Sequence, residues 1–214
     1  MLTLAVDTTA EFGSIALTDR TGTREEILLH STEGFSGILF AQIEALLARN
    51  HVTLRDIELF AGASGPGSFT GVRIGLAAMK GLADVLGKPA AAVSNLAAVA
   101  SFGRGDLRAA LIDARRGEVY AGLFDKSGHA LIPETVLPFP RLLELIGDRE
   151  FSWVSSDFEP FRPALAGTRF EHLPVVTAPR ALAAAIARLA VPHDPVSIEA
   201  NYVRRSDAEL FWKG

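Results

Sequence analysis

Two kinds of residue in this chain have the types and spacing of a nucleotide site. The run GPGSFTG, from Gly65 to Gly71, is a glycine-rich turn leading into a helix, as phosphate-binding loops do. Asp7 and Asp113 each end an apolar run. An aspartate at the end of a first strand, facing a hairpin, suits a water-coordinated magnesium ion beside a nucleotide phosphate. The alternative, which we favour, is that both aspartates accept backbone hydrogen bonds and close tight turns.

The glycine-rich turn matches neither common nucleotide-binding pattern. A P-loop requires lysine after the second glycine of G-x-x-x-x-G-K-[ST], and Ser68 stands at that position. A dinucleotide fingerprint requires G-x-G-x-x-G, whereas Gly65, Gly67 and Gly71 are spaced G-x-G-x-x-x-G. Backbone amides at a helix start can still hold an anion, so a nucleotide or a partner's phosphate site could abut Ser68.

The residue types give little support to hydrolytic chemistry. The chain has no cysteine, which excludes thiolate metal sites and cysteine nucleophiles. Its histidines are not paired at helical spacing. They are His30, His51, His129, His172 and His193. The serine hydrolase pattern G-x-S-x-G does not fit the glycine-rich run either. We therefore expect neither catalytic residues nor metal ligands.

Composition predicts a soluble, well-packed protein. The chain has 214 residues, of which 49% are hydrophobic and 21% charged, enough for a sizeable core in one large or two small domains. The net charge of −4 leaves no general basic surface for nucleic acid. Neither a signal peptide nor a membrane span is recognisable. The absence of cysteine agrees with a cytoplasmic location.

The elements that must position these residues occur in a repeated pattern. The segments LAVDTTAEFGSIALTD and ALIDARRGEVYAGLFD both run strand, aspartate, small loop, glycine, strand, aspartate. Asp7 and Asp113 correspond in the two copies, almost half the chain apart. A repeat of this length indicates duplicated domains. We expect two α/β domains, at 1–103 and 104–214.

The helix after the glycine-rich turn has two apolar stripes on a helical wheel. Mostly small residues form one stripe: Gly71, Gly75, Ala78 and Leu82. Mostly larger residues form the other, about 100° away: Val72, Leu76, Met79 and Ala83. A helix needs only one stripe to dock on its own domain. Either the helix is buried between a sheet and a neighbouring helix, or one stripe faces a partner together with the helix at 39–47.

Several segments together resemble the TsaB (YeaZ) family, which is required for threonylcarbamoyladenosine on tRNA. They are AVDTT followed by GSIAL, GPGSFTGVRIGL, IDARRGEVYAGLF and NYVRRSDAE. The resemblance covers nearly the whole chain and is weakest between about Gly128 and Pro195. It implies an actin-like ATPase (ASKHA) fold with two related strand–helix domains, which agrees with the repeat.

The resemblance also implies a non-catalytic subunit. The sister protein TsaD holds a metal through histidines spaced H-x-x-x-H, and this sequence has no such pair. The chain would bind TsaD as a heterodimer, work with the ATPase TsaE, reach tRNA only through the complex, and form a homodimer when alone. It would have no cofactor of its own, although ATP or ADP could lie at the partner interface.

The implied interface is the helix pair described above, with these residues: Leu39, Ile43, Leu47, Phe69, Val72, Arg73, Leu76 and Met79. The candidates next to a nucleotide or anion are Asp7, Ser68 and Asp113. We expect Val72→Glu or Leu76→Glu to weaken assembly and leave the fold largely intact. Two rival functions remain: a metallopeptidase-like enzyme, and an actin-like-fold kinase using Asp7 and Asp113.

Overall fold

The computed structural model describes residues 1–203, and the chain divides into two compact units. Met1–Asn95 and Arg180–Asn201 form the first unit, and Leu96–Pro179 belongs to the second. Most of the family-like segment NYVRRSDAE, from residue 204 on, lies outside the described residues.

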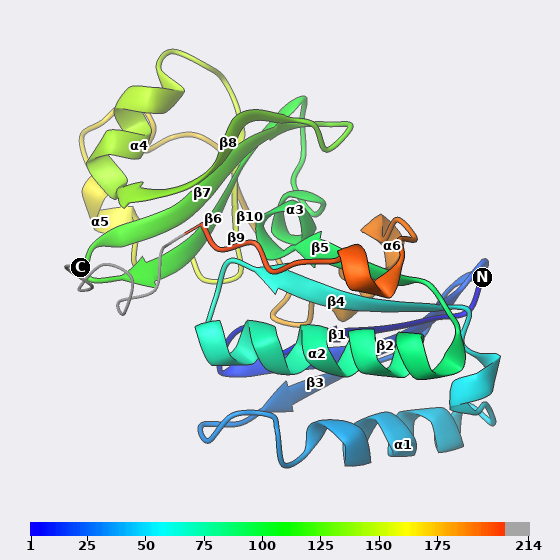
Figure 1. Cartoon of the computed structure of the whole chain (residues 1–214). Helices are drawn as coiled ribbons and strands as arrows, with labels where there is room; N and C mark the ends of the chain where they lie inside the picture. Colours follow the sequence, from blue (N-terminus) through cyan, green and yellow to red (C-terminus); the bar gives the residue numbers. More distant parts are fainter. Residues whose placement is uncertain (204–214) are drawn as a thin grey trace, which may run out of the picture. The chain divides into compact units, whose positions relative to one another are not determined.

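The first unit is a five-stranded sheet in the order β3-β2-β1-β4-β5, covered by helices (Figure 1). Its strands are β1 (Thr3–Asp7), β2 (Phe12–Asp19), β3 (Gly22–His30), β4 (Leu59–Gly65) and β5 (Ala90–Ser94). Its helices are α1 (Leu39–Arg49), the 3-10 turn η1 (Leu54–Asp56), α2 (Phe69–Leu86), α6 (Ala183–Leu189) and the 3-10 turn η2 (Pro195–Ser197). The short helix α3 (Asn95–Ala100) follows β5, where the chain passes to the second unit.

Alternation along β1 and β2 determines which helices cover which face. Val6 lies opposite Ile15 across the two strands, and both belong to the same buried cluster as the inward residues of α1 and α2. Ser14 points to the other face, where its hydroxyl accepts hydrogen bonds from the amides of Leu182 and Ala183 at the start of α6. Thus α1 and α2 share one face of the sheet, and α6 covers the other.

The second unit contains another five-stranded sheet, in the order β10-β9-β6-β7-β8. Its strands are β6 (Leu107–Arg115), β7 (Glu118–Asp125), β8 (Ala130–Pro138), β9 (Ser152–Ser155) and β10 (Val175–Thr177). Its helices are α4 (Phe139–Ile146) and the single turn α5 (Arg162–Leu165). Trp153 on β9 is fully buried in its core, with the ring of Phe151 edge-on at 4.6 Å between centroids.

The two sheets have the same topology. In each, the first strand is central, pairs antiparallel with the strand of its hairpin and parallel with the fourth strand of the unit. Asp7 is the last residue of β1 and Asp113 lies near the end of β6, and Asp113 faces Val119 as Asp7 faces Ser14. The duplication predicted from the repeat is therefore confirmed, and the chain has a two-domain α/β fold of the ASKHA type.

The division between the units differs from the expected ranges 1–103 and 104–214. Residues 180–201 return to the first unit, because α6 packs on β1, β2 and β4 and because the amide of Ala184 donates to the Glu26 carboxylate. Farther along, Lys80 on α2 donates from Nζ to the carbonyl of Ile198 at 2.9 Å. The first unit is thus built from two separate stretches of chain.

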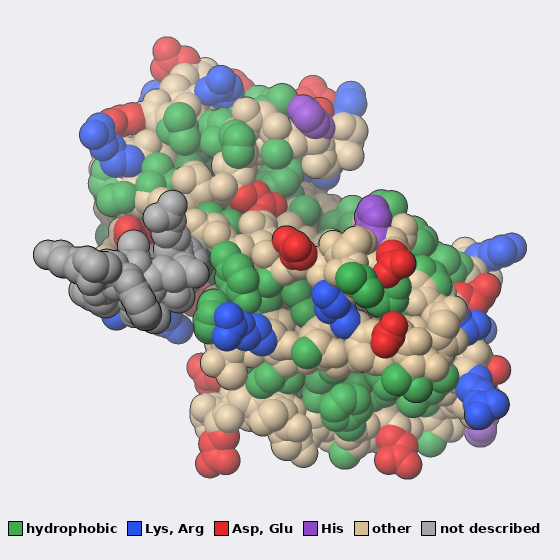
Figure 2. Space-filling model, viewed as in Figure 1, with side chains coloured by type: hydrophobic (Ala, Val, Ile, Leu, Met, Phe, Trp, Pro, Cys, Tyr) green, Lys and Arg blue, Asp and Glu red, His purple; other side chains and the backbone are tan. Residues whose placement is uncertain are grey.

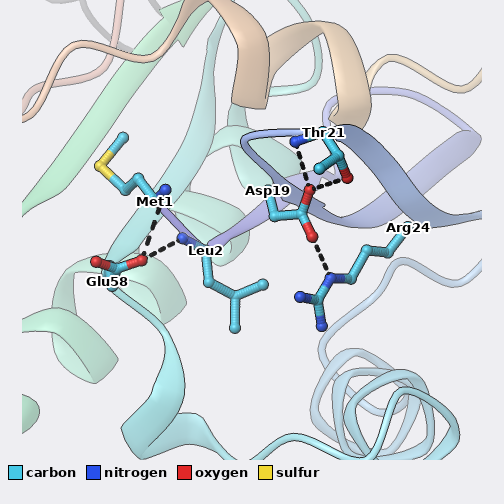
Figure 3. A network of polar contacts seen from close by, with 6 residues as sticks. All are labelled: Met1, Leu2, Asp19, Thr21, Arg24 and Glu58. Carbon is cyan, nitrogen blue, oxygen red and sulfur yellow. Dashed lines mark hydrogen bonds and ion pairs between the residues drawn. The ribbon is translucent and has the colours of Figure 1, made fainter.

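Polar contacts fasten the start of the chain and the β2–β3 turn (Figure 3). The Glu58 carboxylate accepts from the Leu2 amide at 2.6 Å and pairs with the N-terminal ammonium at 3.7 Å. Asp19 accepts from the amide and hydroxyl of Thr21 and pairs with Arg24. These contacts, led by the Thr21 hydroxyl, lower the pKa of Asp19. None of the helices within residues 1–203 is long and apolar enough to span a membrane.

Candidate functional site

The exposed side of α2 is a ridge of residues spaced four apart. Phe69, Arg73, Ala77, Gly81 and Val85 are all exposed, and Val85 is 84% exposed. Residues at this spacing lie in one row along a helix, and such rows form the ridges by which helices pack. The small residues in the middle of the row would let another helix approach closely. We call these five residues the α2 ridge.

The neighbouring helix α1 also exposes apolar surface. Phe40 is 57% exposed on α1, although Leu39 and Ile43 beside it are buried. Hydrophobic side chains gather over the region where Figure 1 draws α1 and α2, as Figure 2 shows. At the start of the ridge, the Arg73 guanidinium lies 3.7 Å from the centroid of the Phe69 ring. Phenylalanine and arginine are among the residue types enriched in protein–protein interfaces.

Six of the eight residues expected at the interface are buried in the core of the first unit. They are Leu39, Ile43, Leu47, Val72, Leu76 and Met79. Only Phe69 and Arg73 are exposed. The helical wheel indicated two apolar stripes but not that both face the sheet. The small stripe meets the β1–β2 loop at Thr8, and the larger stripe meets β4 at Gly62.

The interface expected from the sequence did not include four exposed residues of α1 and α2: Phe40, Ala77, Gly81 and Val85. A signal for three of them was present, because Ala77, Gly81 and Val85 continue the four-residue spacing that begins at Phe69. Alanine and glycine on an otherwise polar helix face do not distinguish that face in the sequence. The α2 ridge can therefore be recognised only once the burial of each residue is known. The signal for Phe40 was its place beside the buried stripe of α1.

Asp7 lies in a closed polar cluster at the carboxyl end of β1. Its side chain is 2% exposed. One carboxylate oxygen accepts from the amide of Thr9 at 2.9 Å and from its hydroxyl at 2.7 Å, and the other accepts from Nδ2 of Asn95 at 3.2 Å. Burial raises the pKa of Asp7, and the hydrogen bonds from Thr9 and Asn95 oppose that rise.

Two glycines of the GPGSFTG run lie directly against the loop that follows Asp7. A Cβ at Gly71 would overlap the carbonyl oxygen of Thr8, and one at Gly67 would come within 2.6 Å of the carbonyl oxygen of Thr9. The turn before α2 therefore presses directly on the loop after β1. The glycines of this run therefore serve a close contact between backbone segments.

The other two nucleotide candidates lie in different settings. Ser68 caps α2, with its Oγ accepting from the amide of Gly71 at 3.3 Å. Asp113 is partly exposed and accepts from the amide of Arg115 at 2.8 Å, two residues on, as Asp7 does from Thr9. Both aspartates thus close a turn, and they belong to different units. Within residues 1–203, no three histidine, aspartate or glutamate side chains gather closely enough to hold a metal ion.

The raised pKa of Asp7 makes the stability of the first unit depend on pH. The folded chain favours the neutral acid more than the unfolded chain does, so its contribution is fully present below the unfolded pKa near 3.8. It is lost as the pH rises through the higher folded pKa. Urea titrations of the wild type and of Asp7→Asn give the difference between their free energies of unfolding. This difference, wild type minus variant, should fall by up to about 1.4 kcal/mol per pH unit above pH 4. A constant difference would contradict this.

In a comparison with known families, residues 31–203 match the family described as TsaD, tRNA N6-adenosine threonylcarbamoyltransferase. Three similar curated proteins are each called tRNA threonylcarbamoyladenosine biosynthesis protein TsaB. The Bacillus subtilis protein is 33% identical over 70% of this chain and 68% of its own length. The Escherichia coli protein is 35% identical over 72% of this chain and 70% of its own length. The Haemophilus influenzae protein is 36% identical over 55% of this chain and 51% of its own length.

Two solved structures share the fold. YeaZ from Pseudomonas aeruginosa superposes with a TM-score of 0.75 at 24% identity and covers 94% of this chain and 99% of its own. An uncharacterized protein with similarity to peptidase YeaZ from Pseudomonas aeruginosa gives a TM-score of 0.77 at 25% identity, with 95% and 99% covered. These values extend the similarity in fold across both units.

Proposed function

Because this chain belongs to the TsaB family of tRNA threonylcarbamoyladenosine biosynthesis proteins, we propose that it is the non-catalytic subunit that binds a TsaD-type catalytic subunit through the α2 ridge. The observation that carries the proposal is that row of exposed residues, with the large side chains Phe69 and Val85 on either side of Ala77 and Gly81. A partner helix can seat against the two small residues while the larger ones enclose it.

The burial of Asp7 and its hydrogen bonds to Thr9 and Asn95 support a role without catalysis by the first unit. Nucleotide chemistry then belongs to the partner, with ATP or ADP at or beyond the junction of the two subunits. In this proposal the ATPase TsaE joins the complex, tRNA is reached only through the complex, and the assembly works in the cytoplasm. With no TsaD-type subunit present, the α2 ridges and Phe40 of two copies form a homodimer.

Ala77→Glu tests the proposal, because glutamate is tolerated on an exposed helix face but places a charge in the centre of the contact. We expect the affinity for the TsaD-type subunit, measured by calorimetry with the full chain, to fall about 30-fold or more. The homodimer should also dissociate in size-exclusion chromatography with light scattering.

The control is Leu131→Glu, which adds the same charge at an exposed leucine on β8 of the second unit. This variant should bind and dimerise like the wild type. Equal binding by both variants would disprove the role of the α2 ridge. A wild-type chain that neither binds the TsaD-type subunit nor is needed with it for tRNA modification would disprove the proposed function itself.

A further inference from the structure

Asp7 is a buried acid that is stabilised by neutral groups. Its carboxylate accepts hydrogen bonds from Thr9 and Asn95, and no charged group contributes to the change in its pKa. Burying a carboxyl group costs free energy unless its hydrogen bonds compensate. An apolar residue at the end of β1 would avoid that cost, so the carboxyl group has a use that an apolar side chain could not supply.

The partners of Asn95 indicate what that use is. Its Oδ1 accepts from the amide of Gly65 at 3.0 Å, and its Nδ2 donates both to Asp7 and to the Thr9 hydroxyl, at 2.9 Å for the latter. An asparagine side chain has one accepting end and one donating end. Because Asp7 only accepts from it, the carboxylate orients the amide so that its oxygen faces Gly65.

Residues 8 and 9 continue the connection into α2. The carbonyl of Thr9 accepts from the Ser68 amide at 2.6 Å, and the Thr8 hydroxyl donates to the carbonyl of Gly71 at 2.7 Å. The turn before α2 is therefore held at Gly65 by Asn95 and at its last residue by Thr9. These two hydrogen bonds, at Gly65 and Ser68, therefore hold the start of α2, whose first turn carries Phe69 and leads to Arg73.

We propose that Asp7 and Asn95 are positioning residues for the partner-binding face. The carboxylate of Asp7 sets the orientation of the Asn95 amide, Asn95 fixes Gly65, and the turn so held determines the direction in which α2 presents Phe69 and Arg73. This rests on the proposed function for the identity of the partner, but the internal connection from Asp7 to the start of α2 can be tested without it.

The hydrogen-bond directions make a reciprocal exchange possible. In Asp7→Asn, the new amide group meets Nδ2 of Asn95, and turning Asn95 over to avoid this would leave Gly65 facing a donor. Either the hydrogen bond between residues 7 and 95 is lost, or Asn95 turns over and Gly65 loses its acceptor. In the double variant Asp7→Asn/Asn95→Asp, the amide at position 7 donates to a carboxylate at position 95, whose second oxygen accepts from Gly65. The double variant therefore restores the connection with the two side chains exchanged.

The experiment compares amide hydrogen exchange of the full chain in the wild type, Asp7→Asn, the double variant and the control Asp19→Asn. Asp19 accepts from the amide and hydroxyl of Thr21 just as Asp7 does from Thr9. It lies at the far end of β2 from Ser14, the residue that pairs with Asp7. We expect Asp7→Asn to accelerate exchange at Gly65 and over residues 68–72 about tenfold, the effect of one buried donor without an acceptor. The double variant should return to within about threefold of the wild type.

Affinity for the TsaD-type subunit, measured on the same variants, should fall about tenfold in Asp7→Asn and recover in the double variant. Should Asn95→Asp prevent folding, Thr9→Val removes one hydrogen bond of the same connection, and faster exchange should be confined to the same turn.

Unchanged exchange in Asp7→Asn and in Thr9→Val would overturn the connection, and changed exchange without changed affinity would overturn its role in partner binding. Mg-ATP binding by the wild type that is lost in Asp7→Asn would assign Asp7 to a metal site instead. Failure of the wild type to bind the partner would count against the proposed function alone.

Discussion

Replacing Gly71 by alanine is expected to cost the first unit about 3–5 kcal/mol, a large part of the stability of an ordinary domain. The added Cβ would overlap the carbonyl oxygen of Thr8, which is backbone and cannot rotate away. Either the first turn of α2 or the loop after β1 must move. The movement would also strain the hydrogen bond from the Thr8 hydroxyl to the carbonyl of Gly71.

The same substitution elsewhere on α2 provides a matched control. A Cβ at Gly81 meets no atom within 4 Å, and glycine in the middle of a helix is less stable there than alanine. Gly81→Ala should therefore raise the free energy of unfolding by roughly 0.5–1 kcal/mol. Urea denaturation followed by circular dichroism measures both variants. Similar effects of the two changes would mean that the contact between Gly71 and Thr8 is not tight in solution.

Leu76→Glu is expected to unfold the first unit, in contrast to the expectation that it would affect assembly alone. Leu76 is 5% exposed, and its Cδ2 reaches into the space next to Gly62 on β4. Glutamate there would lose the packing of leucine and bury a carboxylate among apolar side chains. A loss above about 4 kcal/mol follows from these two costs together.

Ala77→Glu separates folding from assembly, because it adds the same side chain one residue further along α2, on the exposed ridge. Its thermal midpoint should stay within a few degrees of the wild type, since exposed substitutions change stability by about 0.5 kcal/mol or less. Thermal denaturation followed by circular dichroism compares the pair. A folded, soluble Leu76→Glu would contradict the burial of the larger stripe of α2.

The duplication could be predicted because its signal is local. Each copy is a hairpin with an aspartate at or near the end of its first strand, and the residue pattern around Asp7 and Asp113 is enough to align the two copies. The close contact of the glycine-rich turn could be anticipated from its failure to match phosphate-binding spacings. Which atoms it contacts could not, because Thr8 and Gly71 are far apart in the chain.

The sequence predicts the angle between the two apolar stripes of α2, but not which of them faces the sheet. A helical wheel places Val72 about 100° from Gly71, but the sheet is wide enough for both stripes to pack on it. The position of α6 was equally hidden. Its helical pattern was recognisable, yet only the hydrogen bonds from its first amides to Ser14 assign it to the first sheet. Long-range pairings of this kind leave no trace in local periodicity.

The return of residues 180–201 to the first unit has a consequence for synthesis on the ribosome. Translation adds roughly 5 to 20 residues per second. The β1–β5 sheet is therefore complete for several seconds, while the second unit is being made, before the strand-covering helix α6 emerges. During that interval the Ser14 side of the sheet has no helix of its own chain to cover it. We expect nascent chains stalled before residue 180 to be bound by chaperones at this face, and release to follow once α6 can dock.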